Sequence, residues 1–101
     1  MAEHPLKVFE TFDAELLKNV QNSNAFTFAD GALPKKFKLL IAMALDASHG
    51  AADGVKSLAS QAMNAGATKE EIAEAMRVTQ YICGVGSVYV AARAFKELFS
   101  A

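Results

Sequence analysis

One short stretch of the chain collects most of the side chains that could do acid–base chemistry. Asp46, His49, Asp53 and Lys56 are spaced three, four and three residues apart, so they would share one face of a helix that continued through Gly50. A carboxylate one turn from an imidazole can orient the ring, as in a general base with its orienting partner. Asp46 or Asp53 would then orient His49, and Lys56 would offer a positive charge to a small acidic molecule. The alternative is a solvated polar stripe on an apolar helix pair, which is a common pattern.

The same residues do not predict a metal site. Asp46, His49 and Asp53 could supply two oxygen ligands and one nitrogen ligand. Lys56 would repel a cation, however, and the chain has no second internal histidine. We therefore expect neither a metal nor another cofactor.

Cys83 is the single cysteine of the chain, which excludes an internal disulfide and a cysteine zinc site. The thiol would be activated if Gly84 opened the next helix and directed its amides at the sulfur. A free cysteine is more often a small buried hydrophobic residue, and we favour that interpretation. Tyr81 and Cys83 complete the candidate pocket, with Tyr81 expected in the core or at an interface and its hydroxyl at a polar edge.

Helices are the elements that would position these residues. Pro34 suits the start of a helix, and the residues that follow predict one over 35–49. Its middle is apolar on every side, which is typical of a buried central helix. Gly50 interrupts it, and apolar residues recurring every three or four positions predict a second helix over residues 51–65.

The clearest helix boundaries lie in the C-terminal half. Gly66 can end a helix in the left-handed conformation, and Thr68 with Glu71 forms a capping box that predicts a helix over residues 68–83. A glycine-rich break then precedes a last helix, over roughly 87–99. That helix would present one apolar face, made of Val88, Tyr89, Ala92, Phe95 and Phe99.

The N-terminal third has a weaker pattern, and we treat residues 1–33 as a helical extension of a compact core over 34–101. Apolar residues from Leu6 to Phe12 predict a short helix, and Asp13 could cap a second one. Residues 22–31 are expected to form a mixed loop. The fold expected overall is a compact, all-α single domain.

Composition limits what the protein can do. Of its 101 residues 52% are apolar and 21% are charged, against about 45–50% and 25% in an average domain. Disorder is excluded, and the surplus apolar surface predicts self-association into a homo-oligomer. A net charge of −1 without a basic run gives no support to nucleic-acid binding.

The longest apolar run is far shorter than the roughly 20 residues of a membrane span. The N-terminus also lacks the pattern of a signal peptide. We therefore expect a cytoplasmic protein that does not bind a membrane.

Three segments then suggest a relationship. They are Gly-Ala-Leu-Pro-Lys-Lys-Phe-Lys-Leu-Leu-Ile at 31–41, Asn-Ala-Gly-Ala-Thr-Lys-Glu-Glu-Ile-Ala-Glu-Ala-Met at 64–76, and the glycine break at 84–86. Together they resemble the carboxymuconolactone decarboxylase and alkylhydroperoxidase D-like family. The resemblance implies an all-helical homotrimer or homohexamer with decarboxylase or peroxiredoxin-type antioxidant activity.

The same resemblance shows what the chain lacks. Relatives with thiol chemistry carry a Cys-x-x-Cys pair, a histidine four residues on and a glutamate one helix earlier. Counting back from Gly66, those positions hold Ala51, Gly54, Leu58 and Leu39. A dithiol cycle needs two thiols within bonding distance, so this chain should have none. Decarboxylases of the family use the histidine, which is replaced as well.

Two functional hypotheses follow. The leading one is a thiol-independent small-molecule site at the helix junctions near Gly50 and Gly84, with His49 as base or ligand contact. The alternative is a non-catalytic oligomeric scaffold or binding protein. A deep pocket lined by His49 and a carboxylate would favour the first, and a packed junction with the imidazole in solvent would favour the second.

Overall fold

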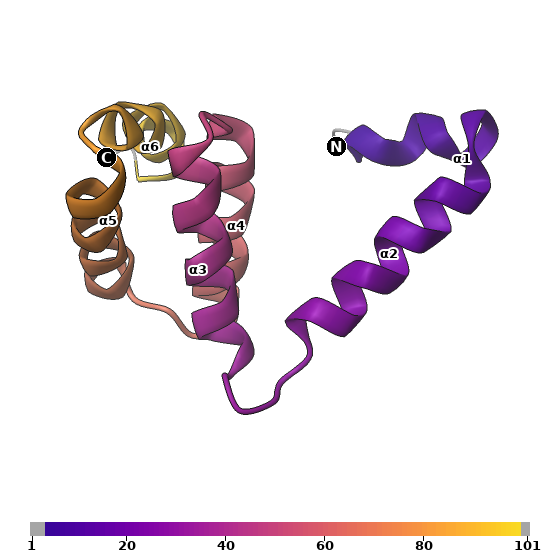
Figure 1. The fold of residues 1–101 in the computed structure, drawn as a ribbon, viewed down its shortest axis with the longest axis horizontal. Coiled ribbons are helices and arrows are strands. Elements are labelled where there is room, and N and C mark those ends of the chain that lie inside the picture. The colour runs from indigo at the N-terminus through magenta and orange to yellow at the C-terminus, as the bar shows by residue number, and fades with distance from the viewer. Residues whose placement is uncertain (1–3, 100–101) are drawn as a thin grey trace.

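The computed structural model describes residues 4–99, and this part of the chain is helical without strands, as predicted (Figure 1). A short 3-10 helix and six α-helices follow one another along the chain. They are η1 (Pro5–Val8), α1 (Phe9–Phe12), α2 (Ala14–Phe28), α3 (Lys35–Ser48), α4 (Ala52–Asn64), α5 (Lys69–Cys83) and α6 (Gly86–Leu98).

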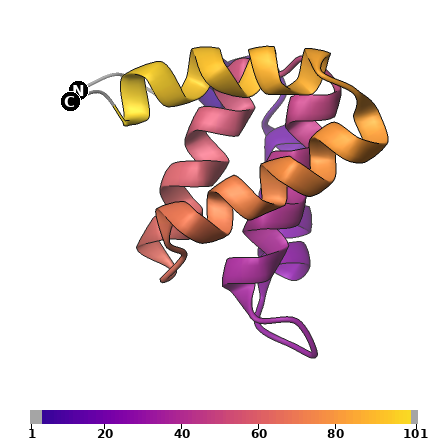
Figure 2. The same ribbon diagram turned by 90° about the vertical axis from the view of Figure 1, so that its left-hand side faces the viewer.

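The hydrophobic core is shared by α3, α4, α5 and α6. Helices α3 and α4 lie side by side, α5 packs against α3, and α6 crosses the ends of these helices (Figure 2). The largest fully buried side chains are Leu39, Met43, Val55 and Ile72. Burying a side chain of this size contributes roughly 1.5–3 kcal/mol, so these residues account for much of the stability of the domain.

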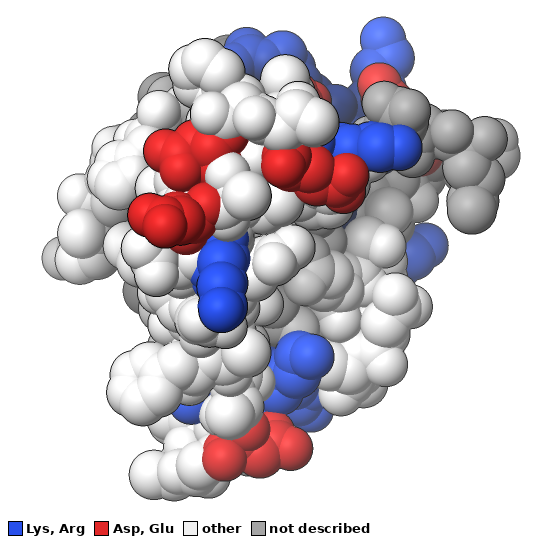
Figure 3. Space-filling model, turned by 90° about the vertical axis from the view of Figure 1, so that its right-hand side faces the viewer, with Lys and Arg blue, Asp and Glu red and all other residues white. Residues whose placement is uncertain are grey.

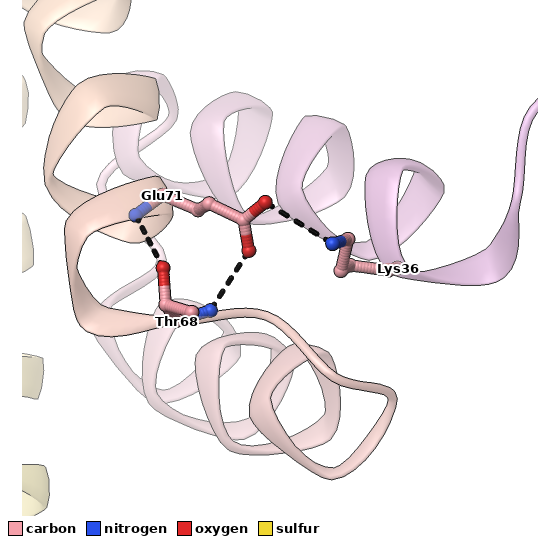
Figure 4. A network of polar contacts seen from close by, with 3 residues as sticks. All are labelled: Lys36, Thr68 and Glu71. Carbon is pink, nitrogen blue, oxygen red and sulfur yellow. Dashed lines mark hydrogen bonds and ion pairs between the residues drawn. The ribbon is translucent and has the colours of Figure 1, made fainter.

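The predicted boundaries inside the core are confirmed. Gly50 and Gly66 have φ angles of 81° and 106°, a left-handed conformation that glycine adopts without strain. The Thr68 hydroxyl accepts a hydrogen bond from the Glu71 amide at 3.0 Å, and the Glu71 carboxylate accepts one from the Thr68 amide at 2.9 Å. Glu71 also pairs with Lys36 at 3.1 Å, which ties the start of α5 to the start of α3 (Figure 4).

The N-terminal arm, which we define as Pro5–Phe28 (η1, α1 and α2), diverges from this core (Figure 1). None of these arm residues is buried, although Phe28 packs partly against the core. The expected loop over residues 22–31 is wrong, because α2 continues to Phe28. Asp13 caps α2 through the Leu16 amide at 3.0 Å, as predicted. The second half of α2 is helical although Asn22, Ser23 and Asn24 are weak helix formers.

The last helix buries a face that overlaps only in part with the one expected, since Phe95 and Phe99 pack partly against the core. Ser87, Ala91 and Ala94 are buried, whereas the Tyr89 side chain is 67% exposed. Small side chains allow α6 to approach the other helices closely, and this contact outweighs the burial of larger side chains on the neighbouring face. Among the described residues, no helix is long and apolar enough to cross a membrane.

Candidate functional site

The turn between α3 and α4 divides the predicted acid–base stripe. His49 caps the C-terminus of α3, and its backbone N–H donates to the carbonyl oxygens of Leu45 and Asp46, each at 3.1 Å. The left-handed conformation of Gly50 then ends the helix. Asp46 and His49 therefore belong to α3, and Asp53 and Lys56 belong to α4, so the four residues do not share one continuous helix face.

Asp46 lies at the closest approach of the two helices. Its carboxylate packs against Gly54 of α4, where an added Cβ atom would lie 2.0 Å from Asp46 Oδ2. The backbone oxygen of Asp46 also accepts a hydrogen bond from the Ala51 amide at 2.9 Å. Asp46 is half-buried, and its carboxylate makes no hydrogen bond or ion pair with another residue between 4 and 99.

His49 lies in a more open environment than Asp46. The residue is exposed, and its imidazole has no hydrogen-bond or ion-pair partner within the described part of the chain. Asp53 is also exposed and occupies the first turn of α4, where a negative charge favours the helix dipole. Neither carboxylate is thus hydrogen-bonded to the imidazole, and the arrangement of a base with its orienting acid is not formed between these side chains.

Lys56 has a partner outside the predicted stripe. Its ammonium group pairs with the Glu97 carboxylate of α6. The hydrogen bond and charge of Glu97 raise the pKa of Lys56, and Lys56 in turn lowers the pKa of Glu97. This surface pair joins α4 to α6, so the positive charge predicted for an acidic ligand is already neutralised.

Tyr81 and Cys83 lie near the exposed end of α5. The expectation that Cys83 is buried is wrong, because the thiol is exposed. Tyr81 is not part of the core either, since it is 83% exposed. Cys83 lines a groove together with Leu45 of α3, and the other residues of the predicted pocket, Asp53, Lys56 and Tyr81, do not line that groove.

Cys83 lies instead at one end of an apolar groove that the sequence analysis missed. The groove has a volume of about 360 Å³ and runs between α3 and α5, and its walls are almost entirely apolar. We call it the α3/α5 groove; its large exposed side chains are Phe37, Ile41, Leu45, Val78 and Ile82. Their spacing of four residues on each helix was the available signal. This signal was missed because the middle of α3 is apolar on every side, so every face of the helix was expected to be buried.

A second, larger cavity of about 560 Å³ lies between the arm and α4. Leu6, Leu17 and Val20 of the arm line it together with Gln61 of α4. His49 and its neighbouring carboxylates line neither this cavity nor the α3/α5 groove. Among the described residues, no group of three or more His, Cys, Asp or Glu side chains is placed to hold a metal ion.

Two of the four positions singled out by the family resemblance, Ala51 and Gly54, lie at the α3–α4 junction. Ala51 is the N-cap of α4, and Gly54 follows in its first turn against Asp46. Leu58 packs partly against the core, and Leu39 is fully buried. Apolar packing and one carboxylate thus occupy the places at which thiol-dependent relatives would carry their reactive groups.

Comparison with known proteins agrees with the fold. The model of the carboxymuconolactone decarboxylase family matches residues 14–97. The chain is also similar to a crystal structure of the apo form of a carboxymuconolactone decarboxylase family protein from Legionella pneumophila. The two are 32% identical with a TM-score of 0.86, over 95% of this chain and 88% of that chain. No curated protein gives a significant match. The chain therefore belongs to the carboxymuconolactone decarboxylase family.

Proposed function

We propose that this protein is a family member without dithiol chemistry that acts as an oligomeric scaffold or binding protein, in the cytoplasm. The proposal depends mainly on the environment of His49. An exposed imidazole without a hydrogen-bonded carboxylate lacks the positioning that a general base needs. The replacement of both family thiols by Ala51 and Gly54 supports the same conclusion.

Activity assays on the full-length protein test this proposal. Peroxide reduction coupled to thioredoxin or to dihydrolipoamide should not exceed that of an identically purified blank. Decarboxylation of carboxymuconolactone, the substrate in the family name, should also be absent. Sustained peroxide turnover that disappears in Cys83→Ser would overturn the proposal and indicate a cycle with one cysteine.

A second candidate function is a thiol-independent small-molecule site, and the position of Asp46 favours it. This carboxylate is half-buried, has no protein partner among the described residues and stands against the backbone of Gly54. A bound molecule could donate a hydrogen bond to this carboxylate. An acidic ligand would in addition need Lys56 to leave Glu97.

Titration of the protein with carboxymuconolactone, followed by amide resonances, separates the two candidates. The small-molecule site requires shifts confined to residues 46–56 that disappear in Asp46→Asn and persist in the matched control Asp53→Asn. Glu97→Gln should then strengthen binding, because it releases Lys56. The scaffold proposal expects no saturable shift in any of these proteins.

A further inference from the structure

Residues 29–34 join the arm to the core at the lower end of the molecule (Figure 1). Among the described residues, Phe28 is the only arm side chain that packs against the core cluster, and it is the last residue of α2. Farther along the arm, a cavity of about 560 Å³ lies between the arm and Gln61 of α4. The direction of the arm therefore depends on the connection at its base.

Two side chains cap helices across this connection in opposite directions. Asp30 Oδ1 accepts a hydrogen bond at 2.6 Å from the amide of Lys35, the first residue of α3. Pro34 precedes α3 and has no side-chain oxygen for this purpose, so Asp30 satisfies the free amide instead. In return, Lys38 Nζ donates a hydrogen bond at 2.7 Å to the carbonyl oxygen of Ala29, which ends α2. A cation at this end of a helix also favours the helix dipole.

The chain between the two caps has little freedom. The ring of Pro34 fixes its φ angle, which is −59°, and the Gly31 amide donates to the Leu33 carbonyl oxygen at 3.2 Å. Lys38 is half-buried, so its alkyl chain is partly confined as well. Acidic and basic side chains lie next to each other at this lower end of the molecule (Figure 3). Hydrogen bonds in which one partner is charged, as in both caps, are stronger than neutral ones.

From these observations we infer that residues 29–34 form a rigid elbow, closed by Asp30 and Lys38, that holds α2 at one angle to α3. Each of the two charged side chains caps the helix on the far side of the bend, so a change of angle breaks both hydrogen bonds. The arm is then a lever of fixed direction and not a flexible tether. The inference does not depend on the proposed function, and it holds whether or not the protein is catalytic.

The test is the distance between a spin label on α2 and one on α5, measured by double electron–electron resonance. Ser23→Cys/Glu74→Cys places the labels at exposed positions in a full-length Cys83→Ser protein, and dilution with unlabelled protein leaves only distances within one chain. This reference protein should give one narrow distance distribution. Adding Asp30→Ala/Lys38→Met should roughly double the width of the distribution or more, because both caps are lost.

Matched variants separate the caps from the charges. Asp30→Asn/Lys38→Arg keeps an acceptor oxygen and a cationic donor, and it should keep the narrow distribution. Lys35→Met removes a neighbouring charge whose side chain takes no part in the caps, and it should also stay narrow. Asp30→Ala and Lys38→Met, made singly, should each broaden the distribution less than the double variant does.

Hydrogen exchange gives a second, local measurement. The Lys35 amide should exchange faster in Asp30→Ala than in the wild type, and Asp30→Asn should restore its protection. Helical content measured by circular dichroism should be the same in all variants, since Asp30 is exposed and Lys38 half-buried.

Three results would overturn the inference. A broad distribution in the reference protein would show that the arm is tethered flexibly. A distribution that stays narrow in Asp30→Ala/Lys38→Met would show that contacts elsewhere set the direction of the arm. Equal broadening in Lys35→Met would show that net charge matters and the caps do not. None of these results changes the outcome of the peroxide or decarboxylation assays, so the proposed function is tested separately.

Discussion

The arm and the core use the same secondary structure but stabilise it differently. In the core, each of the four helices buries at least three side chains, such as Leu39 of α3 and Ile72 of α5. In the arm, no described side chain is buried, and α2 is defined by its Asp13 cap and by helix propensity. Packing usually contributes most of the stability of a helix. The core should therefore fold as a unit, and the arm should unfold more readily than the core.

The largest expected effect is a difference in the free energy of unfolding between a substitution in the core and one in the arm. Leu39→Ala leaves a cavity at a fully buried position and should lower the free energy of unfolding by about 2–5 kcal/mol. Leu16→Ala should lower it by less than about 1 kcal/mol in dilute protein, because this side chain is half-exposed. Urea unfolding at two protein concentrations measures both.

Concentration distinguishes the two regions further. The loss in Leu39→Ala should be almost independent of protein concentration, because Leu39 is buried within one chain. If self-association covers the arm, the loss in Leu16→Ala should grow with protein concentration. Equal losses at both positions under all conditions would contradict the contrast between arm and core.

The next effect concerns the packing of α4 on α3. Gly54→Ala should destabilise the protein by about 1–2 kcal/mol, because the added methyl group meets the Asp46 carboxylate. Asp46→Ala/Gly54→Ala should recover most of this loss. Gly86→Ala is the matched control, since an added Cβ there meets no atom within 4 Å. A Gly54 variant as stable as the control would show that the junction relaxes freely.

A smaller effect compares two helix caps. Thr68→Ala removes the cap of α5 and should lower the global free energy of unfolding by about 1 kcal/mol. Asp13→Ala removes the equivalent cap of α2, and hydrogen exchange should then show faster exchange of arm amides with little change in the core. Loss of global stability in both variants would mean that the arm and core unfold together.

The smallest effect is a pH dependence located in the core. The backbone hydrogen bond with Thr68 and the contact with Lys36 lower the pKa of Glu71 below its ordinary value of 4.5. The ionised carboxylate therefore stabilises the folded state above pH 4.5, and this contribution is lost as the pH falls through the lower folded pKa. Glu71→Gln should make unfolding less dependent on pH in that range, whereas Glu10→Gln in the arm should not.

Sequence reasoning succeeded where a local interaction determines the structure. Gly50 and Gly66 were predicted from the conformations that only glycine adopts easily, and the capping box from two side chains three residues apart. The family was predicted from short segments of the chain, and its model matches residues 14–97. In each case the residues that carry the prediction lie within one short segment of the chain.

It failed where the answer depends on distant contacts. The end of α2 was missed because the polar residues of its second half are typical of a loop. They are helical here because they continue the turns that precede them. The exposure of Cys83 and the choice of face on α6 depend on how close the helices approach, which periodicity does not specify. At the candidate site, the Gly50 turn separates His49 from Asp53, and the Asp46 carboxylate lies against Gly54 of α4. Both arrangements are likewise set by packing.

The close approach at Gly54 also restricts how this sequence can change. By the family resemblance, position 54 is where thiol-dependent relatives carry their second cysteine, and any side chain there meets Asp46. A cysteine at position 54 would therefore require the Asp46 side chain to shift, or a smaller residue at position 46. The two positions are therefore coupled, so the cost of a side chain at position 54 depends on which residue occupies position 46.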